Sequence, residues 1–339
     1  MATREKQGFM KRIVSIRGMG QVVSVTSALI LMCVVFGILN PNFFSSRNVS
    51  NLLRQVVPIL IIGIGQSFVL ITGNIDLSIG SVVGMSCMIS ATMMTRGVNP
   101  WVAALITLMC CLVMGLINGL LVSKAKLPPF IATLGTMIVA RGIAQIANNN
   151  YNTDAIGEGA KVFRNFFYYG ETLGLFNTVW IGFAIFLFFN FILSRTRTGR
   201  HIYAIGSNIE ASKLSGVNVV SITAKVYIIS AACACVVGLI TTATGGLGTM
   251  DAGNGYELNA VAASVIGGVS TLGGQGILLG TVVGSFIWGV LNNGLQFAGA
   301  PVAIRNIVIG IVVVISVLID IVARTGKSNK RLIKSTVVN

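Results

Sequence analysis

Long apolar runs, separated by short polar connections, repeat along almost the whole chain. A membrane-crossing helix needs roughly 17–25 residues, and runs near this length fall at 21–39, 55–72, 78–95, 101–122, 129–147, 178–194, 222–244, 258–270, 277–298 and 303–322. The run at 258–270 is short and ends among glycines, and the second and third runs meet at the polar segment 73–76. The pattern therefore predicts an all-α, polytopic membrane protein with about ten transmembrane helices, some of them broken or re-entrant.

Composition agrees with this pattern and excludes a soluble globular domain. Hydrophobic residues make up 54% of the 339 and charged residues 10%, with a mean hydropathy of +0.85. The 40 glycines favour helices that approach closely in lipid. All six cysteines lie in apolar runs, which indicates packing rather than a disulfide or a zinc site.

The net charge of +15 is distributed in a way that indicates topology. If the N-terminus is cytoplasmic, the inner segments hold 17 of the 24 Lys and Arg residues, as the positive-inside rule requires. We expect a basic cytoplasmic tail at 1–20, a transmembrane domain at 21–322 and a second basic cytoplasmic tail at 323–339. Membrane lipids are the expected partner of these tails, and nucleic acid is not.

Two polar connections are long enough to meet a soluble partner. The predicted outer connection at 148–177 contains Asp154, Glu158 and Glu171, and either docks a partner or is an ordinary solvated loop. The predicted inner connection at 195–221 carries four Lys and Arg residues and the only histidine.

A short capped helix is predicted inside segment 195–221. Ser207 and Glu210 fit a capping box, and Gly216 supplies a left-handed stop, so about two turns of helix run from Asn208 to Ser215. Such a helix is too short to persist alone in water. It either docks a partner or lies as a linker on lipid headgroups.

Polar residues within the apolar runs are candidates for a solute pathway. Asp76 either faces such a pathway or caps a helix at the inner mouth, because an acid is costly inside a membrane. The other candidates, which interhelical hydrogen bonding explains equally well, are Gln66, Asn74, Asn118, Asn292 and Asn293. Segment 78–84 also matches 278–284, a hint of internal duplication.

Signals for catalysis are missing from the sequence. It has one histidine and no HExxH, GxSxG or metal-ligand cluster, so we expect no catalytic, cofactor or metal site. The fragment Gly326-Lys327-Ser328 resembles part of a phosphate-binding loop, but Ile321 stands where that motif requires glycine. We therefore expect no ATP to bind there.

Four sequence blocks together resemble the permeases of bacterial monosaccharide ABC importers, and the ribose-type branch most of all. The blocks are FVLITGNIDLSIGSVVG (68–84), PPFIATLGTMIVARG (128–142), GRHIYAIGSNIEASKLSGVNV (199–219) and GYELNAVAASVIGGVSTLGGQG (255–276). The resemblance covers nearly the whole chain, with the blocks in order at matching spacing. It implies a multi-pass protein of the bacterial cytoplasmic (inner) membrane.

The resemblance also implies partners. The permease would form a homodimer with a second copy and bind a cytoplasmic ATPase, usually with two fused cassettes, that uses ATP and Mg²⁺. A periplasmic or extracellular sugar-binding protein would deliver the sugar. Segment 199–216 is similar to the EAA loop of importers, with Ser212 in place of the second alanine. The implied coupling residues are Arg200, Tyr203, Gly206, Asn208, Glu210, Ala211, Lys213 and Gly216.

The sequence thus predicts a permease subunit that transports a monosaccharide by alternating access and is not itself an enzyme. Two alternatives stay open. One is an ion-coupled secondary transporter that uses Asp76 as a proton or sodium site. The other is an ABC permease for nucleosides or branched-chain amino acids. The sequence does not identify the sugar.

Overall fold

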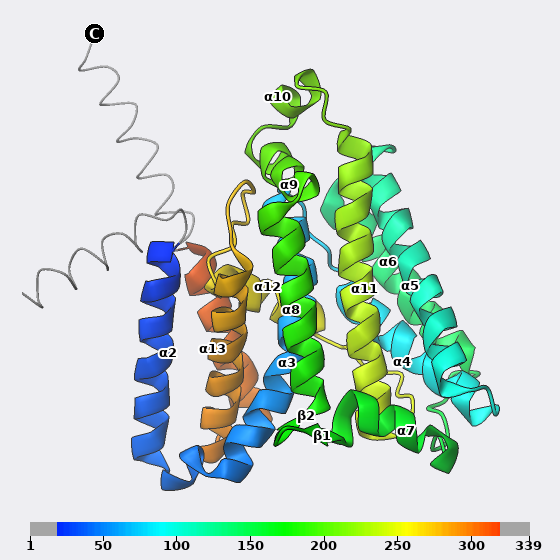
Figure 1. Cartoon of the computed structure of the whole chain (residues 1–339), viewed down its shortest axis with the longest axis vertical. Helices are drawn as coiled ribbons and strands as arrows, with labels where there is room; N and C mark the ends of the chain where they lie inside the picture. The colour runs from blue at the N-terminus through cyan, green and yellow to red at the C-terminus, as the bar shows by residue number, and fades with distance from the viewer. Residues whose placement is uncertain (1–18, 319–339) are drawn as a thin grey trace, which may run out of the picture.

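The computed structural model describes residues 19–318 and shows a bundle of helices that run mostly along one axis (Figure 1). The membrane-type helices are α2 (Met19–Leu39), α3 (Ser46–Ile71), α4 (Ile79–Thr95), α5 (Pro100–Ser123), α6 (Pro129–Ala147), α8 (Asn177–Arg195), α11 (Val219–Gly245), α12 (Tyr256–Ile266), α13 (Leu278–Phe297) and a last helix, Val302–Leu318. The predicted tail at 323–339, most of the tail at 1–20 and Gly326-Lys327-Ser328 lie outside the described residues.

These helices correspond one by one to the ten apolar runs of the sequence, so the predicted all-α polytopic fold is confirmed. Seven are long and apolar enough to cross a membrane. The others are shorter: α4 and the last helix, and α12, which has only 11 residues and is too short to span. The expectation of a broken segment at 258–270 is therefore correct.

The boundary that differs most from its prediction is the start of α3. The second run was placed at 55–72, but α3 begins at Ser46, because the Ser45 side chain accepts from the Asn48 backbone N–H and caps the helix there. Its first turns are polar, so hydropathy alone misses them.

The core of the bundle is built around α3 and α11. In the most apolar stretch of each helix, 83% of the residues of α3 and 72% of those of α11 are buried. In α2 the share is 0%. Glycines let α5 lie directly against α11: a Cβ at Gly115 would lie 2.6 Å from the Tyr227 carbonyl oxygen, and one at Gly119 would collide with Ala224. Small residues therefore bring the two backbones into contact, as is common in lipid.

Two non-helical segments interrupt this bundle. The first connector, residues 72–78, joins α3 to α4, and the second connector, residues 267–277, joins α12 to α13. The two matching sequence fragments, 78–84 and 278–284, lie where each connector passes into its helix. Both helices use glycine there, since a Cβ at Gly80 would lie 2.5 Å from the Gly253 oxygen and one at Gly280 would collide with the Gly267 oxygen.

The two long polar connections lie at opposite ends of the bundle (Figure 1). One end carries α9 (Arg197–Ser207) and α10 (Ile209–Leu214). The other carries η2 (Glu158–Ala160), α7 (Lys161–Arg164), η3 (Asn165–Tyr169) and the antiparallel strands β1 (Glu171–Thr172) and β2 (Leu175–Phe176), while η1 (Pro41–Phe44) links α2 to α3. This arrangement agrees with the predicted alternation of the spans.

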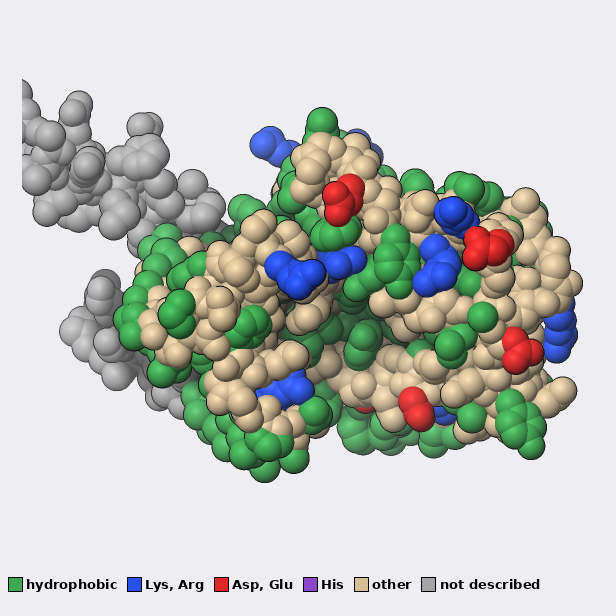
Figure 2. All heavy atoms as spheres, turned by 90° about the horizontal axis from the view of Figure 1, so that it is seen from below, with side chains coloured by type: hydrophobic (Ala, Val, Ile, Leu, Met, Phe, Trp, Pro, Cys, Tyr) green, Lys and Arg blue, Asp and Glu red, His purple; other side chains and the backbone are tan. Residues whose placement is uncertain are grey.

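The end that carries α7 is held together by aromatic side chains. Trp101 at the start of α5 packs edge-to-face on Phe163 and Phe166, with ring centroids 6.1 and 5.2 Å apart. Figure 2 shows this end of the molecule: its acidic and basic side chains are scattered rather than gathered into one patch. Charge alone therefore does not mark a docking surface there.

Candidate functional site

Segment 195–221 forms two short helices rather than one. Thr196 caps α9 by accepting from the Gly199 N–H, 3.3 Å away, and Ile202 and Ile205 bury the inner face of that helix. Helix α9 is not among the elements predicted from the sequence. The Thr196 cap and the i, i+3 spacing of Ile202 and Ile205 were the available signals. Basic residues in the same segment lower its mean hydropathy, so the apolar face is not evident from the sequence.

The second helix, α10, has the predicted position but a different N-cap. The predicted capping box of Ser207 and Glu210 is wrong: Asn208 is the cap, and its side chain accepts from the Ala211 N–H at 2.9 Å. The Ser207 hydroxyl instead donates to the Tyr203 carbonyl because Ser207 still belongs to α9. Glu210 does not reach back either, and pairs with Lys213 at 2.7 Å.

The predicted left-handed stop at Gly216 is confirmed. Gly216 has φ of +80°, and its N–H donates to the Lys213 carbonyl at 2.9 Å, while Val217 N–H donates to Ser212 at 3.0 Å. These bonds satisfy the last carbonyls of α10 and turn the chain towards α11. A six-residue helix is thus fixed at both ends.

The eight predicted coupling residues divide into an outward and an inward set. Six are exposed, namely Arg200, Asn208, Glu210, Ala211, Lys213 and Gly216. Leu214 adds an apolar side chain that is 90% exposed at the tip of the bundle. Ile209 at the start of the same helix is 45% exposed, so α10 presents two apolar side chains beside Glu210 and Lys213 to a protein partner.

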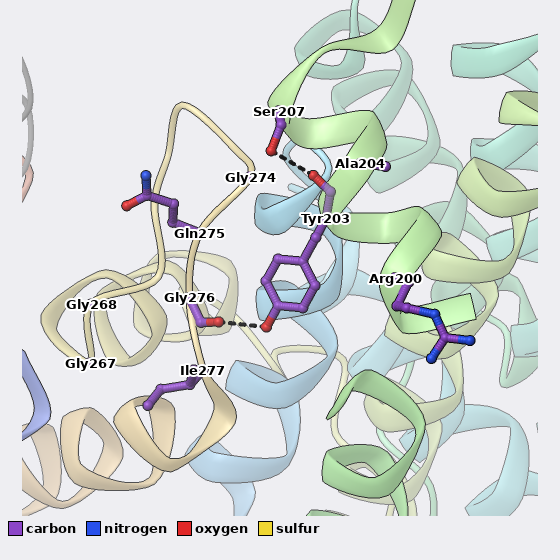
Figure 3. A pocket seen from close by; sticks show the side chains of 10 residues that line it. All are labelled: Arg200, Tyr203, Ala204, Ser207, Gly267, Gly268, Gly274, Gln275, Gly276 and Ile277. Carbon is purple, nitrogen blue, oxygen red and sulfur yellow. Dashed lines mark hydrogen bonds between the residues drawn. The ribbon is translucent and has the colours of Figure 1, made fainter. Parts of the chain in front are cut away.

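Tyr203 and Gly206 form the inward set. The Tyr203 hydroxyl donates to the Gly276 carbonyl of the second connector at 2.6 Å, along a cavity of about 510 Å³ between α9 and that connector (Figure 3). Burial raises the pKa of Tyr203 to about 12. Its hydroxyl is a donor at physiological pH, as that of an ordinary tyrosine with a pKa of about 10 also is. In Figure 3 the Arg200 side chain points away from Gly276.

Asp76 lies in the first connector and is 2% exposed. Its Oδ1 accepts from the Ser78 N–H at 2.9 Å and the Ser78 hydroxyl at 2.6 Å, and its Oδ2 accepts from the Ser230 hydroxyl of α11 at 2.6 Å. Both carboxylate oxygens are therefore engaged by the protein itself.

Asn118 extends this network to two more helices. Its amide donates to the Ser78 hydroxyl at 2.8 Å and accepts from the Thr136 hydroxyl of α6 at 2.5 Å. The network of Asp76, Ser78, Asn118, Thr136 and Ser230, here called the Asp76 network, joins the first connector to α5, α6 and α11. A satisfied buried network of this kind fixes one arrangement of the chain.

Three other pathway candidates also have protein partners. The amides of Asn293 and Asn48 exchange two hydrogen bonds of 3.0 Å between α13 and α3. Asn292 accepts from Arg305 at 3.0 Å, and Asn74 donates to the Thr72 hydroxyl at 2.8 Å. The structure therefore spreads the candidates over several places instead of gathering them into one site.

Gln66 differs from the other candidates. It is 0% exposed in the C-terminal part of α3, and neither polar atom of its amide has a hydrogen-bond partner among the described residues. An unpaired buried amide lowers the stability of the fold, so its presence at this position needs an explanation.

No group of three or more potential metal ligands occurs within residues 19–318.

A bundle of membrane-type helices with two non-helical connectors and a capped two-helix lobe at one end defines a polytopic membrane protein. The family model "Branched-chain amino acid transport system / permease component" matches residues 48–317. The chain belongs to this permease family and is a transport subunit, and the predicted resemblance is confirmed.

Curated relatives extend the match to sugar permeases. The chain is 37% identical over 294 residues to the ribose import permease protein RbsC of Escherichia coli K12, covering 86% of this chain and 91% of the relative. It is 36% identical over 322 residues to RbsC of Bacillus subtilis, covering 94% and 98%. It is 34% identical to the D-allose transport system permease protein AlsC of Escherichia coli, covering 86% and 89%. No solved structure matches.

Proposed function

We propose that this chain is the membrane subunit of an ATP-binding cassette importer for a monosaccharide. The observation that carries the proposal is the α10 tip, with exposed Leu214 between capped ends, on a chain whose relatives are sugar import permeases. A transporter driven by a separate ATPase needs such a docking element. A transporter driven by an ion gradient does not.

The full assembly would contain a second copy of the chain, a cytoplasmic ATPase with two fused cassettes and an external sugar-binding protein. The α9–α10 end and both termini would then face the cytoplasm, and ATP binding would alternate the access of a cavity between the two copies. The excess of basic residues on the predicted inner segments supports this orientation.

Reconstitution tests this proposal against ion coupling. The chain is placed in vesicles with or without its ATPase and sugar-binding protein, and uptake of labelled sugar is measured with ATP or with a proton or sodium gradient. We expect uptake only with all three components and ATP. Gradient-driven uptake by the chain alone would refute the proposal.

The relatives favour a monosaccharide over an amino acid or a nucleoside. The family description mentions branched-chain amino acids, but relatives of 33–37% identity carry the names of ribose, allose, galactose and fructose permeases. Competition in the same vesicles decides: unlabelled ribose, allose, galactose or fructose should reduce uptake, whereas leucine and adenosine should not.

Gln66 is the proposed solute contact among the pathway candidates, because its amide is buried without a partner. Substitution Gln66→Leu should leave thermal stability equal or higher, since it removes an unsatisfied polar group. Sugar uptake should fall about tenfold, the effect of losing one good hydrogen bond in a pathway.

Asn293→Leu is the matched control for Gln66→Leu. Asn293 is bonded to Asn48, so its loss should lower thermal stability and reduce uptake only in proportion to the amount of folded protein. Normal uptake by a stable Gln66→Leu variant would show that Gln66 does not contact the solute in the pathway.

A further inference from the structure

Helix α9 meets both connectors at four glycines, Gly73, Gly206, Gly273 and Gly274, here called the glycine junction. A Cβ at Gly206 would collide with the Ile71 oxygen and lie 2.5 Å from the Gly274 nitrogen. A Cβ at Gly273 would lie 2.9 Å from both the Gly73 nitrogen and the Gly206 oxygen. The three backbones are thus in direct contact, with no room for side chains between them.

Hydrogen bonds close the same junction. The Gly274 N–H of the second connector donates to the Ile71 carbonyl at the end of α3, 2.8 Å away. The Tyr203 hydroxyl of α9 holds the other side of this connector at Gly276 (Figure 3). The second connector is therefore fixed between the end of α3 and the inner face of α9.

Each connector passes directly into a helix of the bundle. The first leads through the Asp76 network into α4 at Ile79, and the second reaches α13 at Leu278, two residues after Gly276. A helix resists bending because its backbone hydrogen bonds run parallel to its axis. A connector has few hydrogen bonds, so its position depends on those few. Movement of α9 can therefore be passed through the two connectors to the first residues of α4 and α13.

We propose that Tyr203 is a positioning residue that transmits movement of α9 through its bond to Gly276, beside the glycine junction, to α13. Its hydroxyl makes the second connector follow α9, so that movement of α9 by the partner ATPase reaches the span. The inference rests on the proposed function, because it requires an ATPase that moves α9. Beyond that function, the inference names Tyr203 as the residue that passes the movement from α9 to the second connector.

Substitution Tyr203→Phe tests this role because it removes one hydroxyl and keeps the ring and the glycine contacts. The complete importer, with ATPase and binding protein, is reconstituted in liposomes, and sugar uptake and ATP hydrolysis are measured together. The sugar transported per ATP hydrolysed should fall about fivefold, the factor that corresponds to one ordinary hydrogen bond. Hydrolysis itself and copurification of the ATPase should be unchanged.

Tyr169→Phe is the matched control. The Tyr169 hydroxyl donates to the Thr244 carbonyl at 2.9 Å, the same kind of bond at the opposite end of the bundle. We expect this variant to keep the wild-type ratio of sugar to ATP.

Three results would overturn the inference: an unchanged ratio in Tyr203→Phe, a parallel loss of hydrolysis and uptake at constant ratio, or an equal loss of ratio in Tyr169→Phe. Failure of the proposed function is a separate result. In that case the wild-type complex itself would show no ATP-dependent uptake.

Discussion

Replacing Gly216 by proline should abolish ATP-dependent sugar uptake while leaving the chain inserted in the membrane. Gly216 has φ of +80° and donates its N–H to Lys213, but proline fixes φ near −65° and has no N–H. The C-terminal cap of α10 is then lost. A six-residue helix does not persist without its caps, so the docking surface loses its shape. Uptake in vesicles and copurification of the ATPase measure the effect, and we expect both to be lost.

Gly216→Asn is the matched control, because asparagine adopts the left-handed conformation and keeps the N–H. It should retain most of the uptake. Adding Glu210→Arg to Gly216→Pro reverses the charge that pairs with Lys213 and should leave no residual activity. Normal uptake by this double variant would show that α10 does not couple the ATPase to transport.

Replacing Asp76 by alanine should destabilise the whole bundle. The change leaves the Ser78 N–H and hydroxyl and the Ser230 hydroxyl without their acceptor in a buried position. Each unsatisfied group costs about 1–3 kcal/mol, so the free energy of unfolding should fall by about 3 kcal/mol or more. Thermal unfolding in detergent and the yield of monodisperse protein measure this loss.

Asp76→Asn separates this structural role from ion binding. The asparagine keeps one oxygen acceptor, and its amide can donate to the Ser230 hydroxyl, so stability should stay much closer to that of the wild type. ATP-dependent uptake should also persist. A stable Asp76→Asn variant without uptake would instead indicate a direct role of the carboxylate in transport.

The sequence was sufficient to predict the helical spans because most apolar runs are long and have no competing pattern. It also located the broken segment at 258–270 from its length and its glycines. The start of α3 was missed because nine polar or mixed residues, capped by Ser45, add little hydropathy. Hydropathy reports contact with lipid, whereas helix ends depend on local hydrogen bonds.

The candidate sites were harder to predict than the fold. Gly216 was found because its conformational requirement is local, but the N-cap of α10 was placed at Ser207 instead of Asn208. Both residue types cap helices well, and only the continuation of α9 decides between them. The partners of Asp76 and Tyr203 lie 154 and 73 residues away in the chain, and no periodicity in one sequence reports such pairings.

The pairing of Asp76 with Ser230 has a consequence for biosynthesis. Ribosomes add roughly 5–20 residues per second, so Ser230 emerges about 8 to 30 s after Asp76. During that interval the acid has left the ribosome without one of its final hydrogen-bond donors. The Oδ1 bonds to Ser78 can form at once, but the Oδ2 bond, and with it the tie between the first connector and α11, forms only after α11 has been synthesised.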